Sequence, residues 1–105
     1  MLSFSDKELL EFYKYEIDAQ LFVLNEAMRG LFNSVESGQP PKTFVSNSKF
    51  VVLSAHKFIY IGDTLHRKIH HDKLGIDITS ATTRLSECVK TLVHATKMAA
   101  LQYPA

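Results

Sequence analysis

The sequence predicts an all-α fold, an antiparallel up-down bundle of long helices that forms one domain over residues 1–105. Apolar residues recur at alternating spacings of three and four along most of the chain, which is the pattern of amphipathic helices in a bundle. One strong helix stop ends the first third of the chain, and no segment has the pattern of a strand. A chain of this length can build one shared core but no second one.

The first helix is predicted over residues 6–37. Ser5 and Glu8 match a capping box at its start, and Gly38 followed by two prolines supplies its end. Its apolar stripe consists of Ile17, Leu21, Leu24, Met28, Leu31 and Val35. Such a stripe is typical of a helix that packs in a bundle.

The second helix is predicted over residues 42–70, after a proline suited to a first helical turn. Its stripe consists of Val51, Ala55, Phe58, Gly62, Leu65 and Ile69. A glycine inside a helix costs about 1 kcal/mol relative to alanine, so Gly62 indicates a close approach between helices. Tolerated slack at this position is the alternative.

The third helix is predicted over residues 78–103, with Asp72–Gly75 as a loop and Asp77 or Thr79 as the cap. Its stripe consists of Ile78, Ala81, Leu85, Cys88, Leu92, Thr96, Ala99 and Tyr103. Three helices of similar length joined by short loops predict an antiparallel arrangement.

Charge and cysteine content exclude several classes of function. Twelve basic and eleven acidic residues give a net charge of +1, which predicts neither a nucleic-acid partner nor an anionic membrane. The most apolar stretch, Phe50–Ile61, is interrupted by polar residues, so no membrane insertion is expected. A single cysteine, Cys88, fits a reducing, cytoplasmic compartment.

Candidate catalytic and metal-binding residues are few. His66, His70 and His71 could share one helical end, but no acidic or thiol ligand accompanies them at the usual spacing. We therefore expect a solvated helix end with at most adventitious zinc or nickel binding, and no metal site, cofactor or enzyme activity. Cys88 is expected to be a small buried hydrophobe. Helix caps and solvated surface are expected for three acidic residues, Asp6, Glu8 and Glu11.

The predicted second helix is apolar on more than one face. Val52 and Ile59 form a second line, and Leu53 and Tyr60 form a third, with Asp63 one turn beyond Tyr60. Such a helix is either central in a larger bundle or presents an outer face to a partner. An aromatic residue beside a charged one favours docking, although burial under a further helix stays open.

Several long tracts, spread from Ser5 to Pro104, resemble the C-terminal domain of the Crk-associated substrate (Cas) scaffold family, and the match extends over essentially the whole chain. They are Ser5-Asp6-Lys7-Glu8-Leu9-Leu10-Glu11-Phe12-Tyr13, Ser37-Gly38-Gln39-Pro40-Pro41-Lys42, Ser48-Lys49-Phe50-Val51-Val52-Leu53-Ser54-Ala55-His56-Lys57, Ile61-Gly62-Asp63-Thr64-Leu65 and Ala95-Thr96-Lys97-Met98-Ala99-Ala100-Leu101-Gln102-Tyr103-Pro104. The resemblance implies a bundle similar to the focal-adhesion-targeting (FAT) domain, with four helices when complete.

The resemblance also implies a function. Family members dock on the C-terminal, exchange-factor-like domain of SH2-containing (NSP) adaptors and support focal-adhesion targeting. The aromatic and the aspartate of the family's Phe-Ile-Gly-Asp segment match Tyr60 and Asp63. Our predicted partner-binding set adds Leu53, His56 and Arg67.

Two other functions stay open. Grooves between helices could bind amphipathic, leucine-rich peptides from focal-adhesion proteins, as related domains do. Alternatively, the bundle could serve only for oligomerisation. The resemblance implies a fourth amphipathic helix after Pro104, and without it we expect either lowered stability or self-association through the groove left open.

Overall fold

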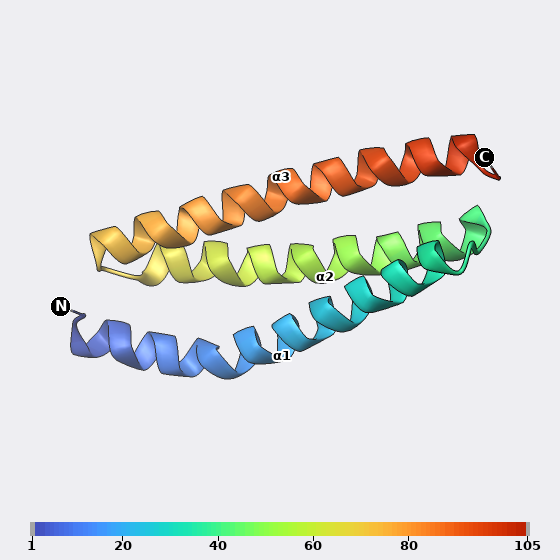
Figure 1. Cartoon of the computed structure of the whole chain (residues 1–105). Coiled ribbons are helices and arrows are strands. Elements are labelled where there is room, and N and C mark those ends of the chain that lie inside the picture. Colours follow the sequence, from blue (N-terminus) through green and yellow to red (C-terminus); the bar gives the residue numbers. More distant parts are fainter. Residues whose placement is uncertain (1, 105) are drawn as a thin grey trace.

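Three long helices make up the fold, and the computed structural model describes residues 2–104 of the chain. They are α1 (Phe4–Glu36), α2 (Pro41–Lys68) and α3 (Asp72–Gln102). The helices run antiparallel to one another and form a molecule 55 Å long (Figure 1). The predicted all-α, up-down architecture is confirmed.

The turn between α1 and α2 has the geometry that the sequence predicts. Gly38 adopts φ 66°, in the left-handed region that glycine tolerates. The N–H of Gly38 donates to Val35 O at 3.1 Å, and the N–H of Gln39 donates to Ser34 O at 3.0 Å. This pair of bonds is a Schellman motif, which satisfies carbonyls at the end of α1. Pro41 then opens α2 in the first helical turn.

The start of α1 differs from the prediction. Ser3 is the N-cap, and its Oγ accepts the N–H of Asp6 at 3.1 Å. Because the helix begins at Phe4, Ser5 lies inside the first turn and cannot cap it. The predicted Ser5–Glu8 capping box is therefore wrong by two residues.

The start of α3 is also wrong in the prediction, by six residues. The helix begins at Asp72, because the ring Nδ1 of His71 accepts the N–H of Leu74 at 3.2 Å and caps the first turn. Gly75 is buried inside that turn. The expected loop over Asp72–Gly75 is helical, and only residues 69–71 separate α2 from α3.

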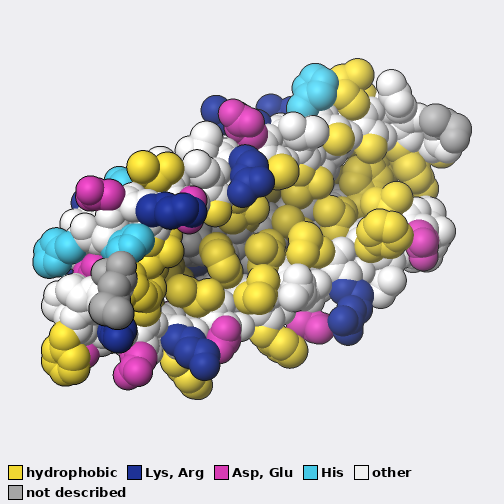
Figure 2. Space-filling model, turned by 60° about the vertical axis from the view of Figure 1, so that its left-hand side comes forward, with side chains coloured by type: hydrophobic (Ala, Val, Ile, Leu, Met, Phe, Trp, Pro, Cys, Tyr) yellow, Lys and Arg dark blue, Asp and Glu magenta, His cyan; other side chains and the backbone are white. Residues whose placement is uncertain are grey.

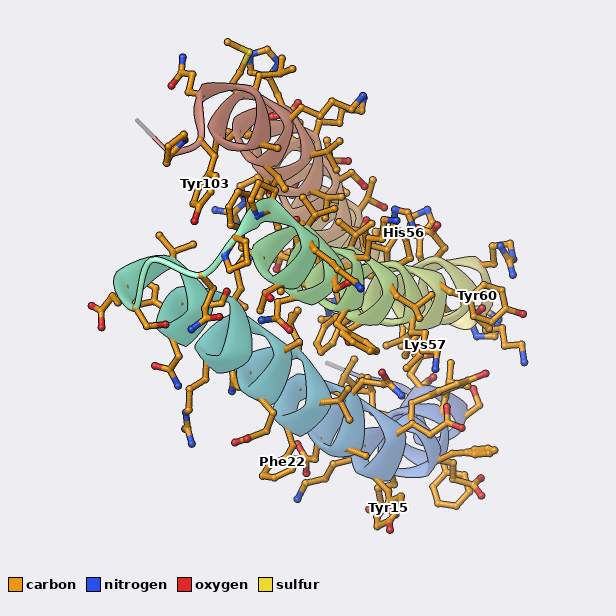
Figure 3. The ribbon with its side chains drawn as sticks, turned by 90° about the vertical axis from the view of Figure 1, so that its right-hand side faces the viewer. Tyr15, Phe22, His56, Lys57, Tyr60 and Tyr103 are labelled. Atoms are coloured by element: carbon orange, nitrogen blue, oxygen red, sulfur yellow. The ribbon has the colours of Figure 1, made fainter. Side chains whose placement is uncertain are left out.

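The middle helix, α2, holds the molecule together. Among the described residues, α1 and α3 each pack along α2, and the backbones of α1 and α3 do not approach each other. Viewed along the helices, α2 lies at the apex of a V whose arms are α1 and α3 (Figure 3). The buried core cluster draws on all three helices and consists of Leu24, Val51, Ala55 and Val89.

The contact between α2 and α3 is close at Gly62, as predicted. A Cβ added to Gly62 would collide with the Thr82 methyl group, so only glycine fits without movement. Farther along the same contact, the hydroxyls of Ser48 and Thr96 hydrogen-bond at 2.9 Å. Between α2 and α1, Asn47 Nδ2 donates to Gly30 O at 3.2 Å.

A long apolar hollow lies between α1 and α3, and we call it the trench. Its edges carry residues of the predicted stripes that remain exposed: Leu21, Met28 and Val35 on α1, and Cys88 and Ala99 on α3. Figure 2 shows hydrophobic side chains gathered along this hollow. The expectation that Cys88 is buried is wrong, because its side of α3 meets no other helix in the described part of the chain.

Candidate functional site

The predicted partner-binding residues lie together on one strip of α2. They are spaced by three, four, three and four residues, which places them on one helical face. All are exposed, and Tyr60 and Leu53 keep 68% and 55% of their surface. In Figure 3, His56 and Tyr60 project from α2 on the side opposite the gap between α1 and α3. We call this strip the crest: Leu53, His56, Tyr60, Asp63 and Arg67.

Two charges on the crest are available to a partner. Among residues 2–104, Asp63 and Arg67 take part in none of the ion pairs, and both side chains are exposed. Arg67 Nη2 donates to Thr64 Oγ1 at 3.4 Å, and Thr64 Oγ1 in turn donates to Tyr60 O at 2.9 Å. The crest therefore combines apolar anchors with free charges, as docking surfaces do.

A groove of about 650 Å³ separates the crest from α1. Leu53, His56 and Tyr60 form part of its wall, and Lys57 and Lys68 add positive charge. A second set of lining residues comes from α1 and includes Tyr13, Tyr15, Glu16 and Gln20. Gln20 Oε1 is buried and has no hydrogen-bond partner among the described residues.

A second groove, the valine groove, runs on the other side of the crest between α2 and α3. It consists of two overlapping depressions of about 430 and 420 Å³. Its apolar surface comes from Val45, Val52, Val89 and Val93. Basic and histidine side chains surround it: Lys49, His56, Lys90, His94 and Lys97. No aspartate or glutamate is among the described residues that line it.

Asp6 is the structural residue that sequence reasoning missed. It was expected on the solvated surface, yet only 1% of it is exposed. Its carboxylate accepts the N–H of His70 at 3.0 and 3.2 Å and the N–H of His71 at 3.0 Å. These bonds attach the start of α1 to the connection between α2 and α3. No sequence signal could have found them, because the donors are backbone groups 64 and 65 residues away.

The histidines at this end have structural partners. His66 Nδ1 lies 3.0 Å from Gly75 O and 2.9 Å from Thr79 Oγ1. His71 caps α3, and His70 Nδ1 lies 3.7 Å from Asp6 Oδ1. His66 and His70 are nonetheless exposed, as expected for a solvated helix end, whereas His71 is half-buried. Within residues 2–104, no three His, Cys, Asp or Glu side chains are grouped to hold a metal ion.

None of the described helices is long and apolar enough to cross a membrane.

A family model described as the Crk-Associated Substrate C-terminal domain matches residues 1–105. The chain belongs to this family. The Cas resemblance of the sequence tracts is thereby confirmed, and the three helices form a Cas-family C-terminal domain.

Curated relatives agree with this assignment. Enhancer of filamentation 1 from Homo sapiens is 45% identical over 103 residues, which is 98% of this chain and 12% of the relative. Breast cancer anti-estrogen resistance protein 1 from Mus musculus is 44% identical over 100 residues, 95% of this chain and 11% of the relative. Embryonal Fyn-associated substrate from Homo sapiens is 36% identical over 104 residues, 99% of this chain and 18% of the relative. The chain thus spans a small part of each relative's length.

Proposed function

We propose that this Cas-family domain is a non-catalytic docking module of a cytoplasmic adhesion scaffold. Its crest binds the C-terminal domain of an NSP-family adaptor, and this contact supports focal-adhesion targeting. Binding free energy alone performs the function, so no cofactor and no chemical step are required.

One observation carries the proposal: the five residues predicted from the sequence share a single exposed face of α2. Tyrosine and arginine side chains that become buried on binding are common centres of protein interfaces. Tyr60 supplies the aromatic ring, and Asp63 and Arg67 supply charges of opposite sign. Grooves on both sides of the crest give a folded partner surfaces on which to close. The other side of α2 forms the core and is not accessible to a partner.

The test is a calorimetric titration of the domain with a purified NSP C-terminal domain. Wild-type chain should bind saturably, and Tyr60→Arg and Asp63→Arg should each weaken binding at least about tenfold. Matched controls are Phe32→Arg, since Phe32 is 66% exposed on α1, and Asp77→Arg on α3. All four variants should unfold at nearly the wild-type temperature, because the replaced side chains are exposed. Retained affinity in both crest variants would refute the site.

The valine groove favours a second candidate function, the binding of an amphipathic, leucine-rich peptide. Its apolar floor can take the leucines of a helix, and its basic rim suits acidic residues beside them. Chemical-shift mapping with such a peptide separates the candidates: shifts centred on Val52 and Val93 support the peptide, whereas shifts centred on Tyr60 and Asp63 support the crest.

The trench has the chemistry expected where the fourth helix of the family bundle would pack. Its edges are apolar and belong to the stripes that the sequence predicts as seams. In the chain described here, self-association through the trench stays a prediction. Light scattering over a concentration series tests it, with Met28→Glu as the variant that should abolish it.

A further inference from the structure

The outer face of α1 carries a second stripe that the core does not use, which we call the acidic ridge. Its members are spaced by four, three, four and four residues and are all exposed: Glu11, Tyr15, Asp18, Phe22 and Glu26. Tyr15 and Phe22 keep 82% and 66% of their surface. Figure 3 shows Phe22 pointing away from α2, and Tyr15 also borders the groove between α1 and α2. Large aromatic rings so exposed, with acidic residues between them, form a surface typical of an interface.

The net charge of +1 conceals a strong separation of charge between helices. Helix α1 contains seven acidic and three basic residues, whereas α2 contains one acidic and five basic residues. Lys49 on α2 and Lys90 and Lys97 on α3 all stand at the valine groove. One side of the molecule is therefore negative, and the surface around the valine groove is positive.

We propose that the acidic ridge of one chain docks in the valine groove of a second copy. The ridge is convex and acidic, and the groove is concave and basic, so the two surfaces complement each other in shape and charge. From Glu11 to Glu26 the ridge spans about 22 Å, and from Val45 to His56 the groove spans about 17 Å, at about 1.5 Å per residue. Phe22 can enter the apolar floor while Asp18 and Glu26 reach the lysines of the rim.

The ridge and the groove are different surfaces, so the contact is heterologous. A docked pair still presents one free groove, on the copy that donates its ridge, and one free ridge, on the other copy, so the assembly grows by addition of further copies. This arrangement places the contact outside the trench. It also needs no other protein, which separates it from the NSP and peptide proposals.

Sedimentation of the domain between about 10 µM and about 1 mM tests the proposal. The wild-type chain should form species that grow with concentration and weaken as salt rises from about 0.05 to about 0.5 M, because salt screens the pairs. Asp18→Lys with Glu26→Lys should weaken association about tenfold, and so should Lys90→Glu with Lys97→Glu. The chain that carries all four substitutions should associate again, because its ridge and groove have exchanged signs.

The matched control is Lys7→Glu with Lys14→Glu, which reverses two exposed charges on α1 outside the ridge and should leave association unchanged. Circular dichroism should show the same helix content in every variant. A wild-type chain that remains monomeric at about 1 mM would overturn the proposal. If neither charge reversal changed the strength of association, the proposal would also be overturned, and the trench would be the surface through which the chains associate.

Discussion

One side of α2 presents Val51, Ala55 and Leu65 to the other helices, whereas the opposite side presents Leu53 and the rest of the crest to solvent. The inner side is largely apolar, although Ser48 and Ser54 are buried in α2 as well. The outer side mixes an aliphatic residue, an aromatic residue and free charges of both signs. A uniformly apolar surface stabilises packing with little discrimination, while mixed chemistry selects a partner. The comparison assigns stability to the inner side and recognition to the outer side.

Paired leucine substitutions in α2 test this division and should give the largest effect on stability. Leu65 is 4% exposed, so Leu65→Ala should lower the free energy of unfolding by about 2–5 kcal/mol. Leu53→Ala should change it by less than about 0.5 kcal/mol while weakening NSP binding. Urea unfolding measures the first quantity and calorimetry the second. If Leu65→Ala and Leu53→Ala lowered the free energy of unfolding equally, the two sides of α2 would not differ in their contribution to stability.

A second comparison sets the buried acid of α1 against an exposed acid of the same helix. Asp6→Ala removes the acceptor for the N–H groups of His70 and His71 and should cost about 1–3 kcal/mol. Asp18→Ala, at an exposed position, should have little effect on stability. Hydrogen exchange should become faster at the amides of His70 and His71 only in the Asp6 variant. Unchanged exchange there would show that these bonds do not hold the helices together in solution.

Two glycines provide a sharper test of helix packing. Gly62→Ala should destabilise the domain by about 1 kcal/mol, because overpacking against Thr82 outweighs the better helix propensity of alanine. Thr82→Ser removes the colliding methyl group and should restore much of the loss. Gly30→Ala should instead stabilise by about 0.5–1 kcal/mol, since a Cβ there meets no atom within 4 Å. Thermal unfolding measures the stability of the variants. A Gly62→Ala chain as stable as the wild-type chain would contradict the close approach of α2 and α3 at Gly62.

The smallest effect is expected at the trench. Cys88 is exposed, so Cys88→Ser should alter the free energy of unfolding by less than about 0.5 kcal/mol. In the wild-type chain, the thiol should react with a maleimide without prior unfolding. A protected thiol would mean that another molecule, or another copy, covers this edge of α3.

Sequence patterns predicted the parts of the fold that depend on local chemistry. Gly38 ends α1 because few other residues adopt its backbone conformation, and Gly62 marks a close contact because a side chain there would collide. The spacing of the crest residues was also readable, since helical periodicity alone places them on one face.

The features that sequence missed depend on distant or unusual partners. His71 caps α3 although histidine is not among the preferred capping residues, so the helix start was placed too late. The role of Asp6 depends on backbone donors from the far end of α2. Cys88, expected to be buried on its stripe, is exposed because the backbones of α1 and α3 do not approach each other in the described part of the chain, and Met28 on α1 is exposed as well.

Methyl NMR of the domain during titration with an NSP C-terminal domain tests the central claim most directly. Leu53 reports on the crest, and Leu21 and Met28 report on the trench. The Leu53 methyl resonances should shift and saturate with the partner, while those of Leu21 and Met28 should stay in place. Shifts at Leu21 and Met28 without a change at Leu53 would contradict the claim and would assign recognition to the trench.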